Sequence, residues 1–189
     1  MIHTEAIAPR WDENKIYQRI HVEPGTSVYE YNADIFPDIL EEVLERLHMH
    51  CCWTADARLT TGVPELDGAE KQLICLFAIE QNVMDRMDEH LAERDLPEAY
   101  LLDALVNEIM FNAADDLCAA ACEAMRSSGC GVTKRYIPGE EPLALTAQKD
   151  MLAAFAGAPE AAAVSMNERG VLWPEKSCLY LFGAAKSLQ

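Results

Sequence analysis

Residues 97–125 read PEAYLLDALVNEIMFNAADDLCAAACEAM, and this stretch decides the fold. Apolar residues recur in it at the spacing of one helix face, which predicts a single long α-helix with a continuous buried side. At 1.5 Å per residue such a helix is about 40 Å long, enough to run the length of a domain. The residues of this buried side are Leu102, Leu105, Val106, Ile109, Ala113, Leu117 and Ala121.

Stretches on either side of the long helix predict strands and a further helix. Residues 71–79 read KQLICLFAI, a continuous apolar run that is typical of a strand covered on both faces. Residues 80–94 predict a helix, because their apolar side chains share one face. Near the C-terminus, Asn167–Gly170 predicts a hairpin turn. The strands expected there are 163–166 and 171–174 on either side of the turn, and then 178–182.

The N-terminal part gives weaker patterns. Pro24-Gly25 is good turn chemistry, because proline fixes φ and glycine accepts the positive φ that follows. We expect short extended pieces around it, at 15–22 and 26–31. A helix is expected to begin near Phe36-Pro37 and to reach Leu47, with Asp34 as its N-cap.

Two segments complete the predicted architecture. Residues 51–70 contain Gly62, Pro64 and Gly68 and are expected to form a loop. Residues 132–142 predict a strand that runs into a tight turn, and residues 143–155 predict another helix. Together the elements predict a single α+β domain over residues 1–189, with helices packed on a small, mostly antiparallel twisted sheet.

Composition excludes several classes of function. The chain carries 32 acidic and 15 basic residues, a formal net charge of −17. A surface this negative repels phosphate backbones and anionic lipid heads, so we expect neither a nucleic-acid-binding nor a membrane role. No apolar run reaches the ~18–20 residues of a membrane span. The first residues lack the pattern of a signal peptide, and seven cysteines then indicate reduced thiols and a cytoplasmic protein.

The metal-ligating residue types form no convincing site. Cys118 and Cys122 share one face of the long helix, but two ligands do not make a site, and buried thiols are the better interpretation. His48-Met-His-Cys-Cys52 is denser, but adjacent residues of a helix diverge by about 100°, so these side chains could not ligate one ion together. We therefore expect a helix end there and no metal site. Asp103 and Glu108 lie beside the apolar stripe, where pairing with a nearby base is favoured over catalysis.

Arg135-Tyr-Ile-Pro-Gly139 is the one local cluster that suggests ligand binding. An arginine at a strand end can bind a carboxylate through two hydrogen bonds. The Pro138-Gly139 turn behind it could expose backbone N–H and C=O groups to a ligand that approaches closely. Such an arrangement could hold a small zwitterion with an adenine ring, although a plain structural turn has the same pattern.

Two motifs give this cluster more weight. Residues 135–150, RYIPGEEPLALTAQKD, resemble the stretch of the reactivation domain of cobalamin-dependent methionine synthase that carries an Arg-x-x-x-Gly-Tyr motif. Residues 173–183, WPEKSCLYLFG, are similar to the Pro-x-x-Ser segment of that family. Residues 73–79 and 101–105 are similar to its strand and to the opening of its long helix. The resemblance covers residues 70–183, whereas residues 1–50 match only loosely.

The resemblance implies a free-standing S-adenosylmethionine-binding domain. It implies an accessory role in methionine biosynthesis, the reductive activation and remethylation of a corrinoid on a partner methyltransferase. Cobalamin would then be on the partner, and a flavodoxin-like protein would be the electron donor. The reactive atoms would be those of the cofactors, so this chain would be at most one part of a cobalamin-dependent methyltransferase system and not a complete enzyme alone. The cofactor-binding residues implied are Arg135, Tyr136, Pro138, Gly139, Glu140, Trp173, Ser177 and Tyr180.

Three departures from the family pattern keep a second interpretation open. Glu140 stands where the motif has tyrosine, and Leu179-Tyr180 replaces a small Ser-Gly pair. Around Phe111-Asn112 the long helix has no acid where family members often carry one. The alternative is therefore a non-catalytic binding module of the same fold that has lost S-adenosylmethionine binding.

Overall fold

A five-stranded antiparallel sheet forms the centre of the computed structural model, which describes residues 1–188. Its strands lie in the order β1-β2-β3-β7-β4. The two nine-residue strands at the centre, β3 and β7, pair with Cys75 opposite Tyr180. The strands are β1 (Ile2–Thr4), β2 (Met49–Thr54), β3 (Lys71–Ile79), β4 (Gly131–Val132) and β7 (Ser177–Ala185).

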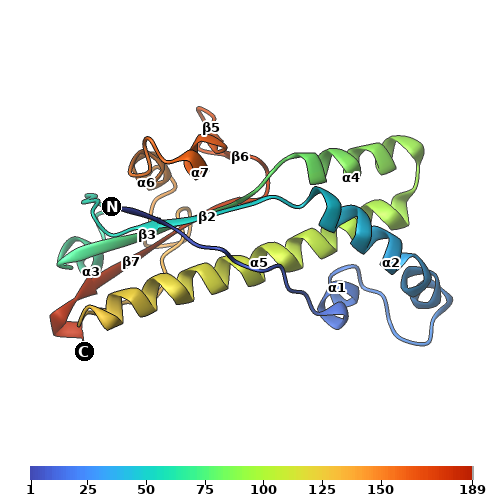
Figure 1. The fold of residues 1–189 in the computed structure, drawn as a ribbon, viewed down its shortest axis with the longest axis horizontal. Coiled ribbons are helices and arrows are strands. Elements are labelled where there is room, and N and C mark those ends of the chain that lie inside the picture. The colour runs from blue at the N-terminus through green and yellow to red at the C-terminus, as the bar shows by residue number, and fades with distance from the viewer. Residues whose placement is uncertain (189) are drawn as a thin grey trace.

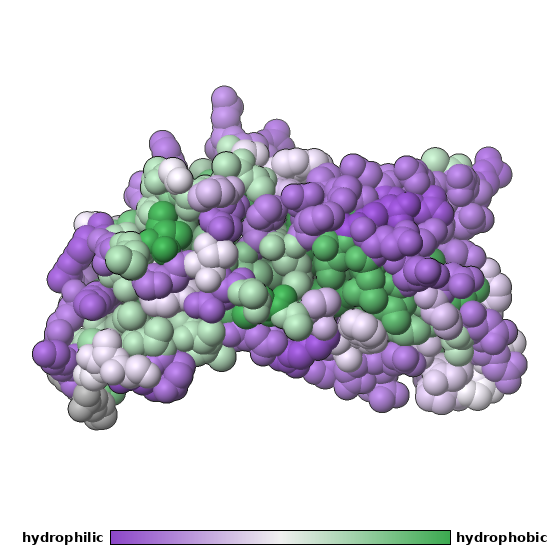
Figure 2. Space-filling model, viewed as in Figure 1, coloured by the Kyte–Doolittle hydropathy of each residue, from purple (hydrophilic) through white to green (hydrophobic). Residues whose placement is uncertain are grey.

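The long helix α5 (Leu96–Ser127) runs along one face of the sheet (Figure 1). It packs on β3 and on β2, and the helices at its N-terminal half pack on it in turn. Those helices are α1 (Glu13–Arg19), α2 (Ser27–Arg46) and α4 (Asn82–Glu93). In Figure 2 the surface over α4 is covered by hydrophilic residues, as expected for a helix with one buried side.

The opposite face of the sheet is covered by short elements (Figure 1). Here a second apolar cluster joins the alternate residues of β3 and β7 to Leu143, Met151 and Phe155. The elements are α6 (Ala147–Ala153), α7 (Pro159–Ala162) and the hairpin of β5 (Ser165–Met166) and β6 (Leu172–Trp173). Helix α3 (Pro64–Asp67) and the 3₁₀ turn η1 (Lys186–Leu188) lie near the far end of β7.

The predicted α+β class and the main elements are confirmed. The strand at 71–79 and the helices at 80–94 and 97–125 agree closely with β3, α4 and α5. The hairpin and the C-terminal strand are also present, while the helix expected at 143–155 is shorter and occupies 147–153.

The predictions for the N-terminal part are mostly wrong. Residues 15–22 and 26–31 are not extended but lie largely in α1 and α2. Helix α2 begins at Ser27, because Thr26 caps it by accepting a hydrogen bond from the N–H of Tyr29 at 3.1 Å. Pro37 therefore lies inside the helix and not at its start.

Two loop assignments also need correction. The segment 51–70 contains the end of β2 and the helix α3. Residues 132–142 form little strand, since β4 ends at Val132 and only Tyr136 adds one bridge, to Leu181. Of the helices in residues 1–188, none has both the length and the apolar character needed to cross a membrane.

Gly183 allows two segments to approach the middle of β7. A Cβ at this position would lie 3.0 Å from Ala69 Cβ and from Thr133 Cγ2, and 3.2 Å from the carbonyl oxygen of Glu65. The backbone N–H of Gly183 donates to Thr133 Oγ1, and its carbonyl accepts from Thr133 N–H, both at 2.9 Å. The close packing therefore fixes the strand that leads to Arg135.

Gly183→Val is expected to lower the free energy of unfolding by about 1–3 kcal/mol, because the added methyl groups overpack the contacts of Gly183 with Ala69 and Thr133. Gly183→Ala should cost less, since only one methyl group must be accommodated. Urea denaturation followed by circular dichroism measures both. Equal midpoints for Gly183→Val and the unaltered chain would show that Ala69 and Thr133 do not pack closely against Gly183.

Candidate functional site

Arg135 lies in the segment between β4 and α6, beside the edge of β7. The neighbouring Tyr136 exchanges two backbone hydrogen bonds with Leu181, of 2.9 and 3.0 Å. Because side chains alternate across an extended segment, Arg135 and Tyr136 project to opposite faces of the sheet. Arg135 lies on the side of α5, and Tyr136 belongs to the apolar cluster of the other face.

The Arg135 guanidinium contacts two side chains on the α5 side. Its Nη1 donates to Asp115 Oδ1 at 2.5 Å, and its central carbon lies 4.7 Å from the ring centroid of Tyr180. This is the one side-chain hydrogen bond that Arg135 makes within residues 1–188. The Arg135 side chain is 39% exposed. We call Arg135, Asp115 and Tyr180 the Arg135 site.

The electrostatics of the site keep Arg135 charged. Burial lowers the pKa of Arg135, but the hydrogen bond and the charge of Asp115 outweigh burial, so the net pKa is raised. Burial, followed by the neighbouring Cys178, raises the pKa of Tyr180. Tyr180 is 6% exposed and presents a neutral ring to the cation. A cation stacked on a buried aromatic ring is held in position with its edge available for an anion.

Three polar residues and one aromatic residue follow α5 at a spacing of four, ending at Asp115. Asp103, Asn107, Phe111 and Asp115 share one side of the helix. Lys176, whose side chain is 9% exposed, donates to Asp103 Oδ1 at 2.7 Å and to Asn107 Oδ1 at 3.1 Å. Phe111 lies between these contacts and Asp115 in the sequence and is 43% exposed. We call these four α5 residues the α5 strip.

The expected pairing of Asp103 and Glu108 with bases is confirmed. Asp103 pairs with Lys176, and the buried Glu108 pairs with Arg19 at 3.1 Å and Lys15 at 3.8 Å. Sequence reasoning did not find the partners, and it missed Asp115 as the partner of Arg135. The sequence carries no local signal for Asp115, because its pairing with Arg135 depends on how the segment around Arg135 aligns with β7.

Other residues of the RYIPG motif take structural roles. Tyr136 is buried, and its hydroxyl donates to Glu65 of α3. Pro138 is buried, whereas Gly139 and Glu140 are exposed. The N–H groups of Gly139 and Glu140 donate to the carbonyls of Leu143 and Ile137, at 2.9 and 3.0 Å. The turn therefore uses these N–H groups internally, which differs from the expectation that they are open to a ligand.

Ser177 and Trp173, unlike the third C-terminal candidate Tyr180, lie apart from Arg135 in the fold. Ser177 starts β7, and its hydroxyl donates to the carbonyl of Pro174 at 2.7 Å. Its side chain is on the other face from Tyr180, because the two differ by an odd number of positions. Trp173 lies in the β5–β6 hairpin and is 53% exposed. Of the eight predicted residues, Arg135 and Tyr180 are in direct contact.

Within residues 1–188, neither the cysteines nor the His48–Cys52 segment brings three ligand atoms close enough together to hold one ion. The segment is not a helix end, since it runs from the loop after α2 into β2. Burial raises the pKa of both Cys51 and Cys52 to about 12, so both remain thiols. All seven cysteines lie in the described part of the chain and are free there.

A cavity of about 890 Å³ lies at the N-terminal half of α5, away from Arg135. The turn between α1 and α2 closes one side of it, and Val28, Tyr31, Leu96 and Tyr100 give it apolar walls. Asp103 and Asn107 also line it, so it borders the α5 strip. Sequence reasoning missed this cavity because it expected no helices at 15–22 and 26–31. Arg19 and Asp103 add charged groups to this mainly apolar cavity, and none of the three residues of the Arg135 site lines it.

Comparison with known proteins gives a match at the level of structure only. No protein-family model matches the chain, and no curated protein sequence is significantly similar. A solved structure described as the MetH reactivation domain bound to AdoHcy is similar, with a TM-score of 0.62 and 13% sequence identity. The match covers 97% of this chain and 78% of that one. The chain therefore has the fold of the MetH reactivation domain.

Proposed function

We propose that this protein binds S-adenosylmethionine at a surface that includes the Arg135 site. The observation that carries the proposal is the guanidinium of Arg135, which lies over the Tyr180 ring and belongs to a side chain that is partly exposed. A similar fold whose description names bound AdoHcy supports the same ligand class.

The chemistry of the Arg135 site fits the amino-acid part of this ligand. The guanidinium would bind the ligand's carboxylate, since arginine donates in a planar fork. Asp115, whose side chain is 60% exposed, would bind the ligand's ammonium group. The exposed ring of Phe111 offers an apolar surface beside them for the adenine or the sulfonium. Tyr136, Pro138, Gly139 and Glu140 would hold the loop in place, with Trp173 and Ser177 further away.

The role proposed for the bound ligand is accessory. The protein would present S-adenosylmethionine to a corrinoid-dependent methyltransferase and support reductive remethylation of the cobalamin on that partner. The cofactors supply the reactive atoms, and this chain would supply binding and orientation. With a net charge of −17, it would meet the partner methyltransferase through a complementary basic face. A flavodoxin-like protein would be the electron donor. We also propose that residues 1–189 act as one domain in the cytoplasm, consistent with the free cysteines.

A second candidate is a binding module of the same fold that no longer binds S-adenosylmethionine. The observation in its favour is that Asp115 already supplies a carboxylate to Arg135. The N–H groups of Gly139 and Glu140 are also used within their own loop. In this case the Arg135–Asp115 pair would only connect the loop to α5.

Calorimetric titration with S-adenosylmethionine tests the first candidate. We expect micromolar binding by the unaltered protein, and Arg135→Ala should weaken it by about 10- to 100-fold, as expected for loss of a charged hydrogen bond. Arg10→Ala is a matched control, because Arg10 also pairs with an α5 carboxylate, that of Asp116 at 2.6 Å. No heat with the folded, unaltered protein, or equal losses in both variants, would contradict the proposal.

Asp115→Asn separates the two candidates. If Asp115 binds the ligand's ammonium group, the variant should bind S-adenosylmethionine about 2- to 5-fold more weakly, the usual size for an exposed ion pair. The same titration should give unchanged binding for an analogue that lacks the amino group. Under the second candidate the unaltered protein gives no binding, and binding gained by Asp115→Asn would show that the Asp115 carboxylate occupies Arg135 in place of the ligand.

A further inference from the structure

Three ligand-type side chains meet where α4 ends and α5 begins. His90, Glu93 and Asp95 each place one ligand atom within 4.8 Å of the others. The chain geometry brings them together, because Arg94 adopts a left-handed φ of 69° and reverses the chain after α4. The N–H of Asp95 then donates to the carbonyl of His90 at 2.9 Å, which returns Asp95 to the side of His90.

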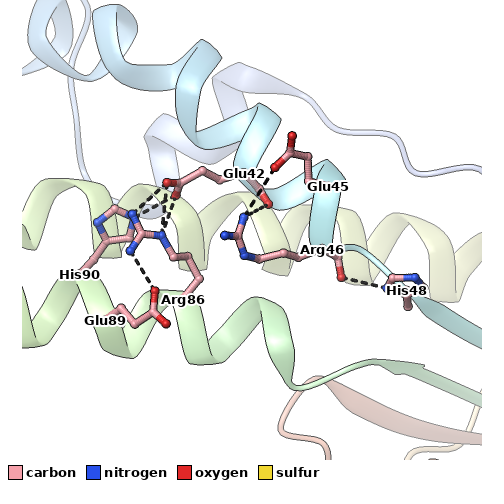
Figure 3. A network of polar contacts seen from close by, with 7 residues as sticks. All are labelled: Glu42, Glu45, Arg46, His48, Arg86, Glu89 and His90. Atoms are coloured by element: carbon pink, nitrogen blue, oxygen red, sulfur yellow. Dashed lines mark hydrogen bonds and ion pairs between the residues drawn. The ribbon is translucent and has the colours of Figure 1, made fainter.

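His90 is the buried member of this cluster and has an unused nitrogen. The residue is 5% exposed, and its Nε2 lies 3.0 Å from Glu42 Oε2. Its Nδ1 is buried and has no hydrogen-bond partner among the described residues. Figure 3 shows the two ring nitrogens of His90, with Glu42 at one of them and the other directed away from Glu42. A buried polar atom without a partner costs free energy, so this nitrogen calls for a partner.

The surroundings of His90 fix which nitrogen is available. Arg86 donates to both carboxylate oxygens of Glu42, at 2.9 to 3.2 Å, and so holds that carboxylate against the histidine ring (Figure 3). A carboxylate only accepts, so a neutral His90 carries its proton on Nε2 and presents a lone pair at Nδ1. A carboxylate that orients a histidine in this way is the usual outer partner of a metal-bound imidazole.

The two carboxylates are free to complete a site. Glu93 and Asp95 are exposed, and Asp95 makes no side-chain capping bond to α5 in the described chain. Ligand atoms of a tetrahedral zinc site are about 3.4 Å apart at bond lengths near 2.1 Å, a distance that small rotations of exposed side chains can reach. The C-terminal end of α4 carries partial negative charge, which favours a cation as well.

We propose that His90 Nδ1, Glu93 and Asp95 bind a divalent transition-metal ion of the zinc type. One imidazole and two carboxylates suit Zn²⁺, whereas Mg²⁺ and Ca²⁺ prefer oxygen ligands throughout. The expectation from sequence was no metal site, because it considered only the cysteine-containing segments. The proposal does not depend on S-adenosylmethionine binding, since no residue of the Arg135 site is involved. A bound ion would connect the end of α4 to the start of α5.

Titration of metal-free protein comprising residues 1–189 tests this site, with Zn²⁺ followed by calorimetry and Co²⁺ followed by absorption. We expect about one equivalent of tightly bound ion. Glu93→Gln with Asp95→Asn should weaken binding at least about 10-fold, as expected for loss of ligands. The matched control is Asp85→Asn with Asp88→Asn, which removes the same charge from exposed positions of α4 and should leave binding unchanged. His90→Asn should also lose binding, with circular dichroism to check that it folds.

The cysteines provide the main competing explanation, and Co²⁺ distinguishes it. Cobalt bound by nitrogen and oxygen lacks the intense near-ultraviolet band of thiolate ligation, so we expect visible bands only. A thiolate band, full-strength binding by the Glu93→Gln, Asp95→Asn variant, equal weakening in the control, or no binding at all would each overturn the proposal. Zn²⁺ should also raise the melting temperature of the unaltered protein, and not that of the double variant.

Discussion

Packing of α5 against the sheet is the constraint on which the rest of the structure depends. The apolar side of α5 is buried against β2, β3 and β7, and α1, α2 and α4 pack around the same helix. Burial of this size is the main source of stability, because each buried large aliphatic side chain contributes about 1.5–3 kcal/mol. The polar side of α5 adds specificity by binding segments that are distant in sequence. These pairs are Asp103–Lys176, Glu108–Arg19, Asp115–Arg135 and Asp116–Arg10.

Much of the fold could be predicted because local pattern and tertiary burial agree in its central elements. Residues 71–79 are apolar throughout and lie in a strand covered on both faces, and residues 97–125 have one apolar side that faces the sheet. Residues 15–22 were different, since the alternation of polar and apolar residues from Arg19 to Val22 is compatible with a strand. They form a helix because Asp12 caps it and because Ile16 and Tyr17 are adjacent residues buried in the same cluster.

The candidate site could be predicted only in part, for a reason of geometry. Sequence reasoning chose neighbours in the motifs, but an extended chain sends neighbours to opposite faces. Arg135 and Tyr180 therefore meet, while Tyr136 and Ser177 belong to the other side of the sheet. The partner Asp115 could not be identified, because it depends on how the segment around Arg135 aligns with β7. The His90 cluster was missed for a similar reason, since it needs the chain reversal at Arg94.

The burial of α1 and α2 against α5 also determines how the chain can be divided. Ile16, Phe36, Ile39 and Val43 belong to the same apolar cluster as the inner side of α5. A shortened chain that starts at β2 would leave their positions on α5 open to water, although residues 70–183 carry all the recognisable motifs. The sequence resemblance would suggest dividing the chain before residue 70. The shortened protein would expose apolar surface on α5 and would be prone to self-association. The smallest independently folding unit therefore begins before β2, because it must include α1 and α2.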